Sequence, residues 1–334
     1  MKKKKIVIFG GTGNLGIYFV DYCVSHLDLN KYEIIVIGRK KTDYFKKRNI
    51  EYINIDINNK EDFNKLPTEN VFCVVNMAGI LPAYSKMTNE ELIAETNFVG
   101  GIRILEYAKK VKSKRILYMQ TWSEYAGHWN KKKELGPKLE RKLCYSGDHA
   151  FYSITKSAVV DSIKYYYEQY GLNYSIFVLP NIYLYSPLKE YYVDGKKKKI
   201  AYRYIIDRVS SGKDVELWGN PNAYKDIVYV KDFCQMVFKG MFTNVECGTY
   251  FVGTGKKTTL KTQIEGIIKV FGPLNKEVRI IEHPEKQSFT SFVMNIQNAI
   301  DDLGYNPEYD YISYLKDYKK EMEQKRFDDI FIKN

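Results

Sequence analysis

The sequence predicts an α/β protein, in which a doubly wound parallel sheet is followed by a smaller mixed α/β domain. Two observations predict this fold. Short apolar runs of strand length alternate with amphipathic stretches of helix length, and a glycine-rich turn directly follows the first run. After residue 179 the alternation loosens, and prolines and lysine runs separate shorter elements. We therefore expect one domain over residues 1–179 and another over residues 180–334, some segments of which return to the first.

The expected strands of the first domain are short apolar segments, and the expected helices lie between them. The strands are Ile6–Phe9, Glu33–Ile37, Tyr52–Ile55, Val71–Met77, Arg115–Met119 and Tyr174–Leu179. Helical spacing of apolar residues marks Leu15–Leu27, Asn89–Lys110 and Ala150–Tyr170. Right-handed crossovers between such strands place helices on both faces of a parallel sheet.

The second domain is expected to mix shorter helices and strands. Its helices are Tyr202–Ser211, Lys231–Phe242, Leu260–Phe271 and Asn295–Leu303, and its strands are Val215–Trp218, Ile227–Val230, Thr249–Val252 and Val278–Ile281. Neither an internal repeat nor a low-complexity tail is present in the sequence.

Composition excludes several classes of protein. Of the 334 residues, 45% are hydrophobic and 28% are charged, which is typical of a globular chain. No apolar run approaches the roughly 20 residues of a membrane span. The apolar stretch after the N-terminal lysines ends after four residues, too early for a signal peptide. We therefore expect a cytoplasmic protein with no membrane partner.

The net charge of +12 is compatible with anionic ligands and with nonspecific nucleic-acid binding. The lysine runs Lys131–Lys133 and Lys196–Lys199 lie in polar connecting stretches, as solvated loops do. We therefore interpret the basic surface as mostly solvated lysine, with no specific nucleic-acid partner. The five cysteines form no C-x-x-C pair, and we expect reduced thiols and no metal site.

A glycine-rich segment follows the first strand and opens the first helix. It reads Gly10-Gly11-Thr12-Gly13-Asn14-Leu15-Gly16. Glycines permit a tight turn and let backbone N–H groups approach a pyrophosphate, which then rests on the positive end of the helix. The strand–turn–helix context predicts a Rossmann-type dinucleotide site that includes Gly10, Gly13, Asn14, Leu15 and Gly16. The alternative is a purely structural glycine turn.

The end of the second strand bears on the choice of dinucleotide. An NAD enzyme usually places an Asp or Glu there for the ribose 2′-hydroxyl. This chain has Arg39 and Lys40 instead, and these cations are suited to a 2′-phosphate. The residues therefore favour NADP(H), with NAD(H) as the other possibility, unless both side chains point into solvent.

Tyr152 and Lys156 lie one helical turn apart in the sequence, on the same face of an expected helix. An isolated tyrosine has a pKa near 10 and exchanges protons poorly at neutral pH. A fixed cation beside it stabilises the phenolate and brings the pKa toward the working range. A Y-x-x-x-K match occurs readily by chance in this tyrosine- and lysine-rich chain, so the signal comes from its place between the fifth and sixth strands.

Over nearly its whole length the chain resembles the extended short-chain dehydrogenase/reductase family, in particular its nucleotide-sugar epimerases, dehydratases and 4-keto reductases. The resemblance implies that Tyr152 and Lys156 are the catalytic pair and that the Thr121 hydroxyl binds the reacting oxygen. It also implies further cofactor contacts, at Asp56 and Ile57 for the adenine, at Ala78 and Gly79 for the ribose and diphosphate, and at the helix asparagine Asn97. A second-half segment, Tyr224–Asp232, resembles the family stretch whose cation binds the nucleotide diphosphate, and this cation is Lys225 here.

Some residues depart from the family pattern. Lys225 replaces the usual Arg, so a bidentate grip is reduced to a point charge. Asn181 is spaced differently from the family asparagine that contacts substrate, and Ser123 competes with Thr121 as the hydroxyl residue. The linker between Thr121 and Tyr152 is longer than usual.

The reaction that the resemblance implies is an NAD(P)-dependent oxidation and reduction at C4 of a nucleotide-diphosphate sugar. Arg39 and Lys40 favour an NADPH-dependent reductase of a 4-keto sugar. The alternative is a 4-epimerase with tightly bound NAD. A 4,6-dehydratase is less favoured because Trp122-Ser123-Glu124 stands where a dehydratase has its acid and base. A noncatalytic RNA-binding relative is also less favoured, because such a protein has no need for the Tyr–Lys pair. A homodimer is expected by resemblance alone.

Overall fold

The computed structural model describes residues 2–84, 89–147, 149–193 and 195–332. Over these residues seven parallel strands form the main sheet, in the order β14-β7-β5-β4-β1-β2-β3. The strands are β1 (Lys4–Phe9), β2 (Tyr32–Gly38), β3 (Glu51–Asn54), β4 (Val71–Asn76), β5 (Arg115–Thr121), β7 (Asn173–Leu179) and β14 (Cys247–Phe251). The order reverses between β1 and β4, which is the Rossmann-type arrangement. The predicted fold class is confirmed.

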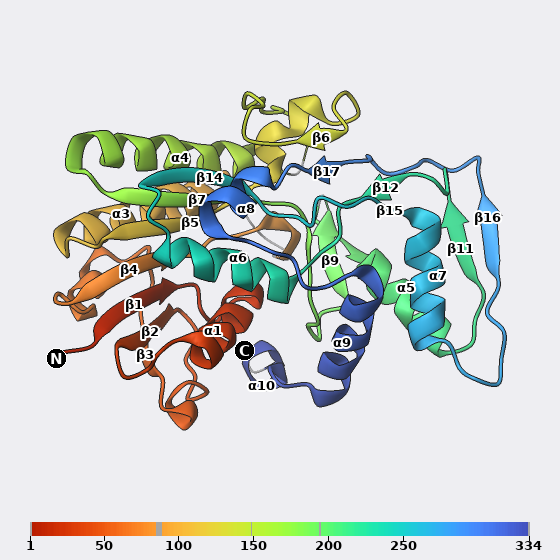
Figure 1. Cartoon of the computed structure of the whole chain (residues 1–334), viewed down its shortest axis with the longest axis horizontal. Coiled ribbons are helices and arrows are strands. Elements are labelled where there is room, and N and C mark those ends of the chain that lie inside the picture. The colour runs from red at the N-terminus through yellow and green to blue at the C-terminus, as the bar shows by residue number, and fades with distance from the viewer. Residues whose placement is uncertain (1, 85–88, 148, 194, 333–334) are drawn as a thin grey trace.

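The inner strands of the sheet, β1, β2, β4, β5 and β7, are largely buried on both faces, and neighbouring residues of β1 belong to different cores. In β1, Ile6 and Ile8 join the core under α1 (Asn14–His26) and α6 (Val230–Phe242). Val7 and Phe9 join the core under α3 (Gly100–Lys110) and α4 (Ala150–Tyr170). Because side chains alternate along a strand, a continuous apolar run is what a two-faced sheet requires. Figure 1 shows α6 and α1 crossing in front of the strands.

The expected helix Asn89–Lys110 is present but has an internal irregularity. It begins with the short helix α2 (Glu90–Ile93), passes through a π-helical turn (Ala94–Val99) and continues as α3. Such single π turns interrupt the regular backbone ladder and occur often at functional sites. The turn carries Asn97, one of the predicted cofactor residues.

The remaining elements lie mostly in the second half of the chain. Its helices are α5 (Ala201–Ser210), α7 (Leu260–Phe271), α8 (Gln297–Leu303), α9 (Tyr311–Gln324) and α10 (Asp328–Ile332). Five short strand pairs accompany them: β6 (Glu134–Leu135) with β17 (Val293–Met294), β8 (Ile182–Tyr183) with β13 (Val228–Tyr229), β9 (Glu190–Val193) with β10 (Lys196–Lys199), β11 (Val215–Trp218) with β16 (Ile280–His283), and β12 (Tyr224–Lys225) with β15 (Thr258–Thr259).

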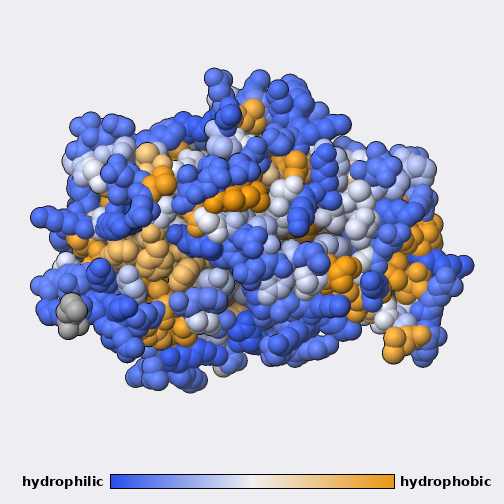
Figure 2. All heavy atoms as spheres, in the orientation of Figure 1, coloured by the Kyte–Doolittle hydropathy of each residue, from blue (hydrophilic) through white to orange (hydrophobic). Residues whose placement is uncertain are grey.

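The second half is not a separate block in space. In Figure 1, α5, α7, β11 and β16 form the right-hand end of the molecule, whereas α6 and β14 lie with the main sheet. α9 and α10 run back along the lower edge toward α1, where Arg326 pairs with Asp21 at 2.9 Å. Figure 2 shows hydrophilic residues over most of this face, with apolar residues in scattered patches. No helix among the described residues has the length and apolar character needed to cross a bilayer.

The lysine run Lys196–Lys199 corrects one expectation. We predicted a solvated loop there, but these residues form β10, which pairs antiparallel with β9. All four lysines are exposed. A strand made only of exposed lysines carries no apolar alternation, so the periodicity that reveals other strands is absent here. Lys131–Lys133, by contrast, lies in an irregular loop as expected.

Asp232 anchors the turn that leads into the C-terminal helices. It is buried in the first turn of α6, and its carboxylate accepts hydrogen bonds from the backbone N–H groups of Glu308 and Tyr309 at 2.7 and 3.3 Å. Burial raises the pKa of Asp232 from 3.8 to about 6, although these hydrogen bonds oppose the shift. The folded state therefore disfavours the charged form of the Asp232 carboxylate relative to the protonated form.

We expect this cost to appear as a pH-dependent difference between the wild type and Asp232→Asn. The pKa is raised on folding, so the stabilising contribution of Asp232 is complete below pH 3.8 and is lost as the pH rises to about 6. The free energy of unfolding of the wild type, relative to the variant, should fall by on the order of 3 kcal/mol across this interval. Urea unfolding at several pH values measures the difference, and a constant difference would contradict the assignment.

Candidate active site

The glycine loop lies at the carboxyl end of β1, beside the point where the strand order reverses. Gly10 has φ +78°, and a Cβ there would lie 2.7 Å from the backbone N of Ala78. A Cβ on Gly16 would lie 2.1 Å from the Gly10 carbonyl oxygen. Gly13 precedes α1 without any side-chain cap, and the first turn has no acidic residue. The first-turn N–H groups, including those of Asn14 and Leu15, therefore face a position suited to an anion, so these residues fit a dinucleotide diphosphate.

Asp56 and Ile57 are held rigidly at the carboxyl end of β3. The Asp56 carboxylate accepts a hydrogen bond from the Asn58 N–H at 3.0 Å, and the Asp56 N–H donates to Asp62 at 2.8 Å. The Ile57 carbonyl accepts from Arg103 at 3.0 Å. The structure thus brings both residues to the same edge of the sheet as the glycine loop.

Ala78 and Gly79 form the loop after β4, which faces the Gly10 turn. Asn97, buried in the π-helical turn, accepts a hydrogen bond from the Ile80 N–H at 2.7 Å and donates to the Ile80 carbonyl at 3.0 Å. The Asn97 amide therefore uses both its groups on the loop backbone. The Asn97 side chain therefore supports the loop that contains Gly79.

The two cations after β2 are engaged differently. Arg39 is exposed. The Lys40 ammonium donates a hydrogen bond to the Ile330 carbonyl of α10 at 2.9 Å, and partial burial lowers its pKa. Lys40 thus connects the end of β2 to the C-terminal helix, 290 residues away in the chain. One of the two cations that favoured NADP(H) already has a partner within the protein.

Tyr152 and Lys156 lie in the first two turns of α4, which packs against β5. Lys156 is buried, and its Nζ lies 4.1 Å from the ring centre of Tyr118 on β5. The Tyr118 hydroxyl donates to the Lys156 carbonyl at 3.3 Å. Burial lowers the pKa of Lys156 to about 7, and burial also raises the pKa of Tyr152. The ring face of Tyr118 offsets part of the cost of burying the ammonium.

Thr121 ends β5 and is buried beside the first turn of α4. Its Oγ1 accepts a hydrogen bond from the Ser123 N–H at 3.2 Å, which caps the helical turn Trp122–His128. The Thr121 O–H is then left to donate to another oxygen. Ser123 is also buried. Trp122 stacks on Trp129 and Phe292, with ring centres 4.5 and 4.3 Å away.

Glu124 is a buried carboxylate that lies in a network with Gln120 and Arg141. It accepts a hydrogen bond from Gln120 at 2.6 Å and forms an ion pair with Arg141 at 3.2 Å. Gln120 also donates to Ser157 at 3.2 Å and accepts from the Thr121 N–H at 2.9 Å. Burial raises the pKa of Glu124, and its hydrogen bond from Gln120 and its pairing with Arg141 oppose this shift. The network fixes the end of β5 against α4.

Lys225 and Asn181 lie in the second half of the chain. Lys225 is on β12 with its Nζ 4.1 Å from the ring centre of Phe289, and burial lowers its pKa. The neighbouring Asp226 is buried and accepts hydrogen bonds from Thr254, Gly255 and Met294 at 2.7 to 3.1 Å. Asn181 is exposed just before β8. None of the described contacts connects Asn181 with the Tyr152 side chain.

Sequence reasoning missed three supporting residues of the site. The ring of Tyr118 contacts the Lys156 ammonium, and Gln120 on β5 donates a hydrogen bond to Ser157 on α4. Asp226 accepts a hydrogen bond from Gly255 and so fixes the segment that carries Lys225. Tyr118 and Gln120 precede Thr121 at intervals of three and one residues on β5, but nothing in the sequence marks which buried strand residues face the helix.

Comparisons with known proteins identify the family and the fold of this chain. The model of the NAD dependent epimerase/dehydratase family matches residues 6–253. A Methanocaldococcus jannaschii protein named "Putative UDP-glucose 4-epimerase" is 25% identical over 314 residues, covering 91% of this chain and 94% of that protein.

Two solved structures are similar in fold. The UDP-glucose 4-epimerase of Thermotoga maritima with UDP-glucose has a TM-score of 0.73 at 20% identity, over 96% of this chain and 99% of that one. The UDP-glucuronic acid 4-epimerase of Bacillus cereus with NAD has a TM-score of 0.70 at 16% identity, over 95% and 99%. Because the family model matches most of the length of this chain, the chain belongs to the NAD dependent epimerase/dehydratase family.

Proposed function

We propose that this protein is a 4-epimerase of a nucleotide-diphosphate sugar and retains NAD throughout its cycle. The observation that carries the proposal is the Tyr152–Lys156 pair in the first turns of α4, in which Lys156 is buried and Tyr152 partly buried, in a chain whose glycine loop directly follows β1. The names of the similar proteins support the epimerase over the reductase that Arg39 and Lys40 favoured. The engagement of Lys40 with Ile330 supports NAD over NADP(H), because it leaves Arg39 as the single cation of the pair.

The chain's own residues supply the proton chemistry. NAD, when bound, supplies the hydride acceptor and donor for the sugar C4. Tyr152 takes the proton from O4 during oxidation and returns it during reduction. The Lys156 ammonium stabilises the phenolate form of Tyr152, and the free O–H of Thr121 donates a hydrogen bond to O4. Lys225 supplies a positive charge for the diphosphate of the substrate.

The state of Glu124 argues against a 4,6-dehydratase. Elimination requires an acid and a base that reach C5 and C6 of the sugar. Glu124 is the one carboxylate in the segment Thr121–Glu124, and it is buried and committed to Gln120 and Arg141. A carboxylate held in this network does not exchange protons with a sugar without losing its ion pair.

Tyr152→Phe should lower epimerase turnover by a factor on the order of 10² to 10⁴, since it removes one positioned proton carrier. NAD binding and the unfolding temperature should change little. Tyr145→Phe is the matched control, because Tyr145 is exposed in the linker before α4. Interconversion of UDP-glucose and UDP-galactose, followed beside a panel of other nucleotide sugars, is the measurement. Near-wild-type turnover of Tyr152→Phe on whichever sugar the wild type epimerises would contradict the assignment.

Lys156→Ala should differ from Tyr152→Phe in kind. We expect it to lower both turnover and cofactor retention, because the ammonium is proposed to hold the nicotinamide ribose as well as to stabilise the Tyr152 phenolate. The ratio of bound dinucleotide to protein after gel filtration measures retention. Full retention in Lys156→Ala would limit the residue to a role on Tyr152.

The cofactor that stays with the purified protein should be NAD, and Lys40→Ala should not change its identity. Because Lys40 contacts Ile330, the variant should instead lower the unfolding temperature by loosening α10. Mass spectrometry of the nucleotide released by denaturation gives the answer. Recovery of NADP from the wild type would restore the reductase prediction. So would recovery of NADP from the wild type that is lost in Lys40→Ala.

A further inference from the structure

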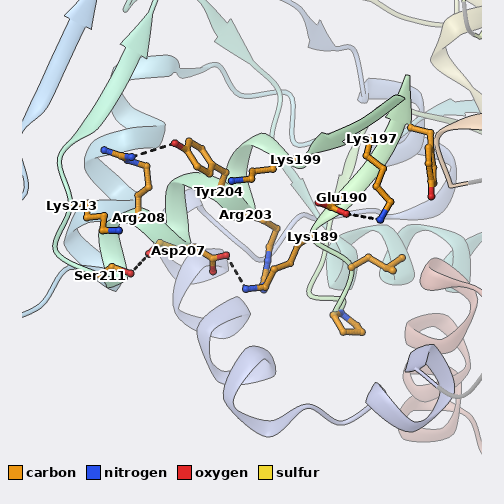
Figure 3. A pocket seen from close by; sticks show the side chains of 13 residues that line it. Lys189, Glu190, Lys197, Lys199, Arg203, Tyr204, Asp207, Arg208, Ser211 and Lys213 are labelled. Atoms are coloured by element: carbon orange, nitrogen blue, oxygen red, sulfur yellow. Dashed lines mark hydrogen bonds and ion pairs between the residues drawn. The ribbon is translucent and has the colours of Figure 1, made fainter. Parts of the chain in front are cut away.

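A groove of about 790 Å³ lies between the β9–β10 hairpin and α5. We call it the hairpin groove (Figure 3). Its volume is in the range of small-molecule sites. Among the described residues, those that line it include none of the predicted catalytic, cofactor or substrate residues. The proposed epimerase therefore makes no use of this groove.

Two regular surfaces build the groove. On the hairpin, Lys199 pairs across the strands with Glu190 and Lys197 with Tyr192, and these four residues line it. On α5, Arg203 and Asp207 lie four residues apart on one helix face, and the C-cap residue Ser211 follows them. Figure 3 shows side chains from the hairpin and from α5 around the same hollow. Such a wall is more rigid than a loop surface.

The groove carries an excess of positive charge. Its acidic residues are already paired, Asp207 with Lys189 at 2.9 Å and Glu190 with Lys197 at 3.0 Å. Four further cations line it, and no carboxylate among the described residues forms an ion pair with any of them: Lys199, Arg203, Arg208 and Lys213.

Arg203 gives the clearest sign of a missing partner. It is only 4% exposed, and its Nη1 donates to the Tyr318 hydroxyl at 2.8 Å. Its guanidinium lies 5.3 and 5.8 Å from the ring centres of Tyr185 and Tyr318. The Nε is buried without any hydrogen-bond partner. Asp207, one helical turn further along α5, attracts Arg203 but is itself paired with Lys189. A buried cation with an unused donor is costly, and an anion in the groove would offset part of this cost.

We propose that the hairpin groove binds a small ligand that carries a diphosphate group, at a site separate from the active site. Several phosphate oxygens match the point charges of Lys199 and Lys213, with the positive charge of Arg203 behind them. A concave site of this size accommodates a compact ligand. A flat anionic surface would instead attract exposed lysines whether or not they line the groove, including Lys198, which points away from the groove lining.

Adjacent lysines on β10 allow a matched test. Lys199→Glu places a negative charge in the groove, whereas Lys198→Glu makes the same change on the opposite face of the same strand. Titration calorimetry with inorganic diphosphate should show binding to the wild type. Lys199→Glu should weaken it by about tenfold or more, because a close attraction becomes a repulsion. Lys198→Glu should weaken it by less than about threefold at 0.15 M salt.

Separate titrations with inorganic diphosphate and ADP identify the source of the group. Tighter, Lys199-dependent binding of ADP indicates a nucleotide, and equal binding indicates the diphosphate alone. Both results support the site. Arg203→Met tests whether the buried Arg203 donor contributes to diphosphate binding. If loss of the Tyr318 contact unfolds Arg203→Met, Lys199→Glu still tests the site.

Three results would overturn the proposal. The first is no diphosphate binding by the wild type at millimolar concentration. The second is equal weakening by Lys198→Glu and Lys199→Glu, which together with binding to phosphatidic acid vesicles would indicate a flat membrane contact. The third is loss of binding in Lys225→Ala but not in Lys199→Glu, which would place the diphosphate in the substrate site. Epimerase turnover should be unchanged in Lys199→Glu, so failure of this proposal and failure of the proposed function are distinguishable.

Discussion

The close approach of the β1 turn to the loop after β4 is the constraint on which the site depends. No Cβ fits at Gly10, because it would lie 2.7 Å from the backbone of Ala78. The same approach brings the uncapped start of α1 to the point where the strand order reverses, and parallel sheets bind ligands there. Asn97 then fixes the second loop from its π-helical turn. A change in any of these backbone positions would move the cofactor site relative to Tyr152.

The sheet was predictable from the sequence because strands buried on both faces form continuous apolar runs, and the six expected strands of the first domain all occur. The glycine loop and the Tyr152–Lys156 pair were predictable because their chemistry requires fixed local spacing. The contact of Lys40 with Ile330 was not, since it joins residues far apart in the chain and uses a backbone carbonyl. The ion pair of Glu124 with Arg141 likewise depends on how the long linker folds back. The β9–β10 hairpin was missed because lysines on an exposed strand give no periodic signal.

Burial acts in opposite directions on the pKa values of Tyr152 and Lys156, the two proposed catalytic groups. It raises the pKa of Tyr152 and lowers that of Lys156, so it favours the neutral form of each. The ring of Tyr118 favours the ammonium, and a bound substrate and dinucleotide change the balance further. The cations of the chain lie in two different environments. Lys156 is buried, and burial brings its pKa to about 7, so that it is charged in only part of the molecules near neutral pH. In the hairpin groove, several cations lack acidic partners among the described residues.

The position of β14 in the sheet has a consequence for how the chain folds. β14 pairs with β7 at residues Cys247–Phe251, yet β7 already ends at Leu179. Until the ribosome has produced this late strand, Ile176 and Val178 sit on an unpaired apolar edge, and exposed edges of this kind promote aggregation. The sheet can therefore close only after more than two thirds of the chain has emerged, through contacts between distant residues that form slowly. Nascent chains of this protein would spend a long interval as clients for chaperones that shield strand edges.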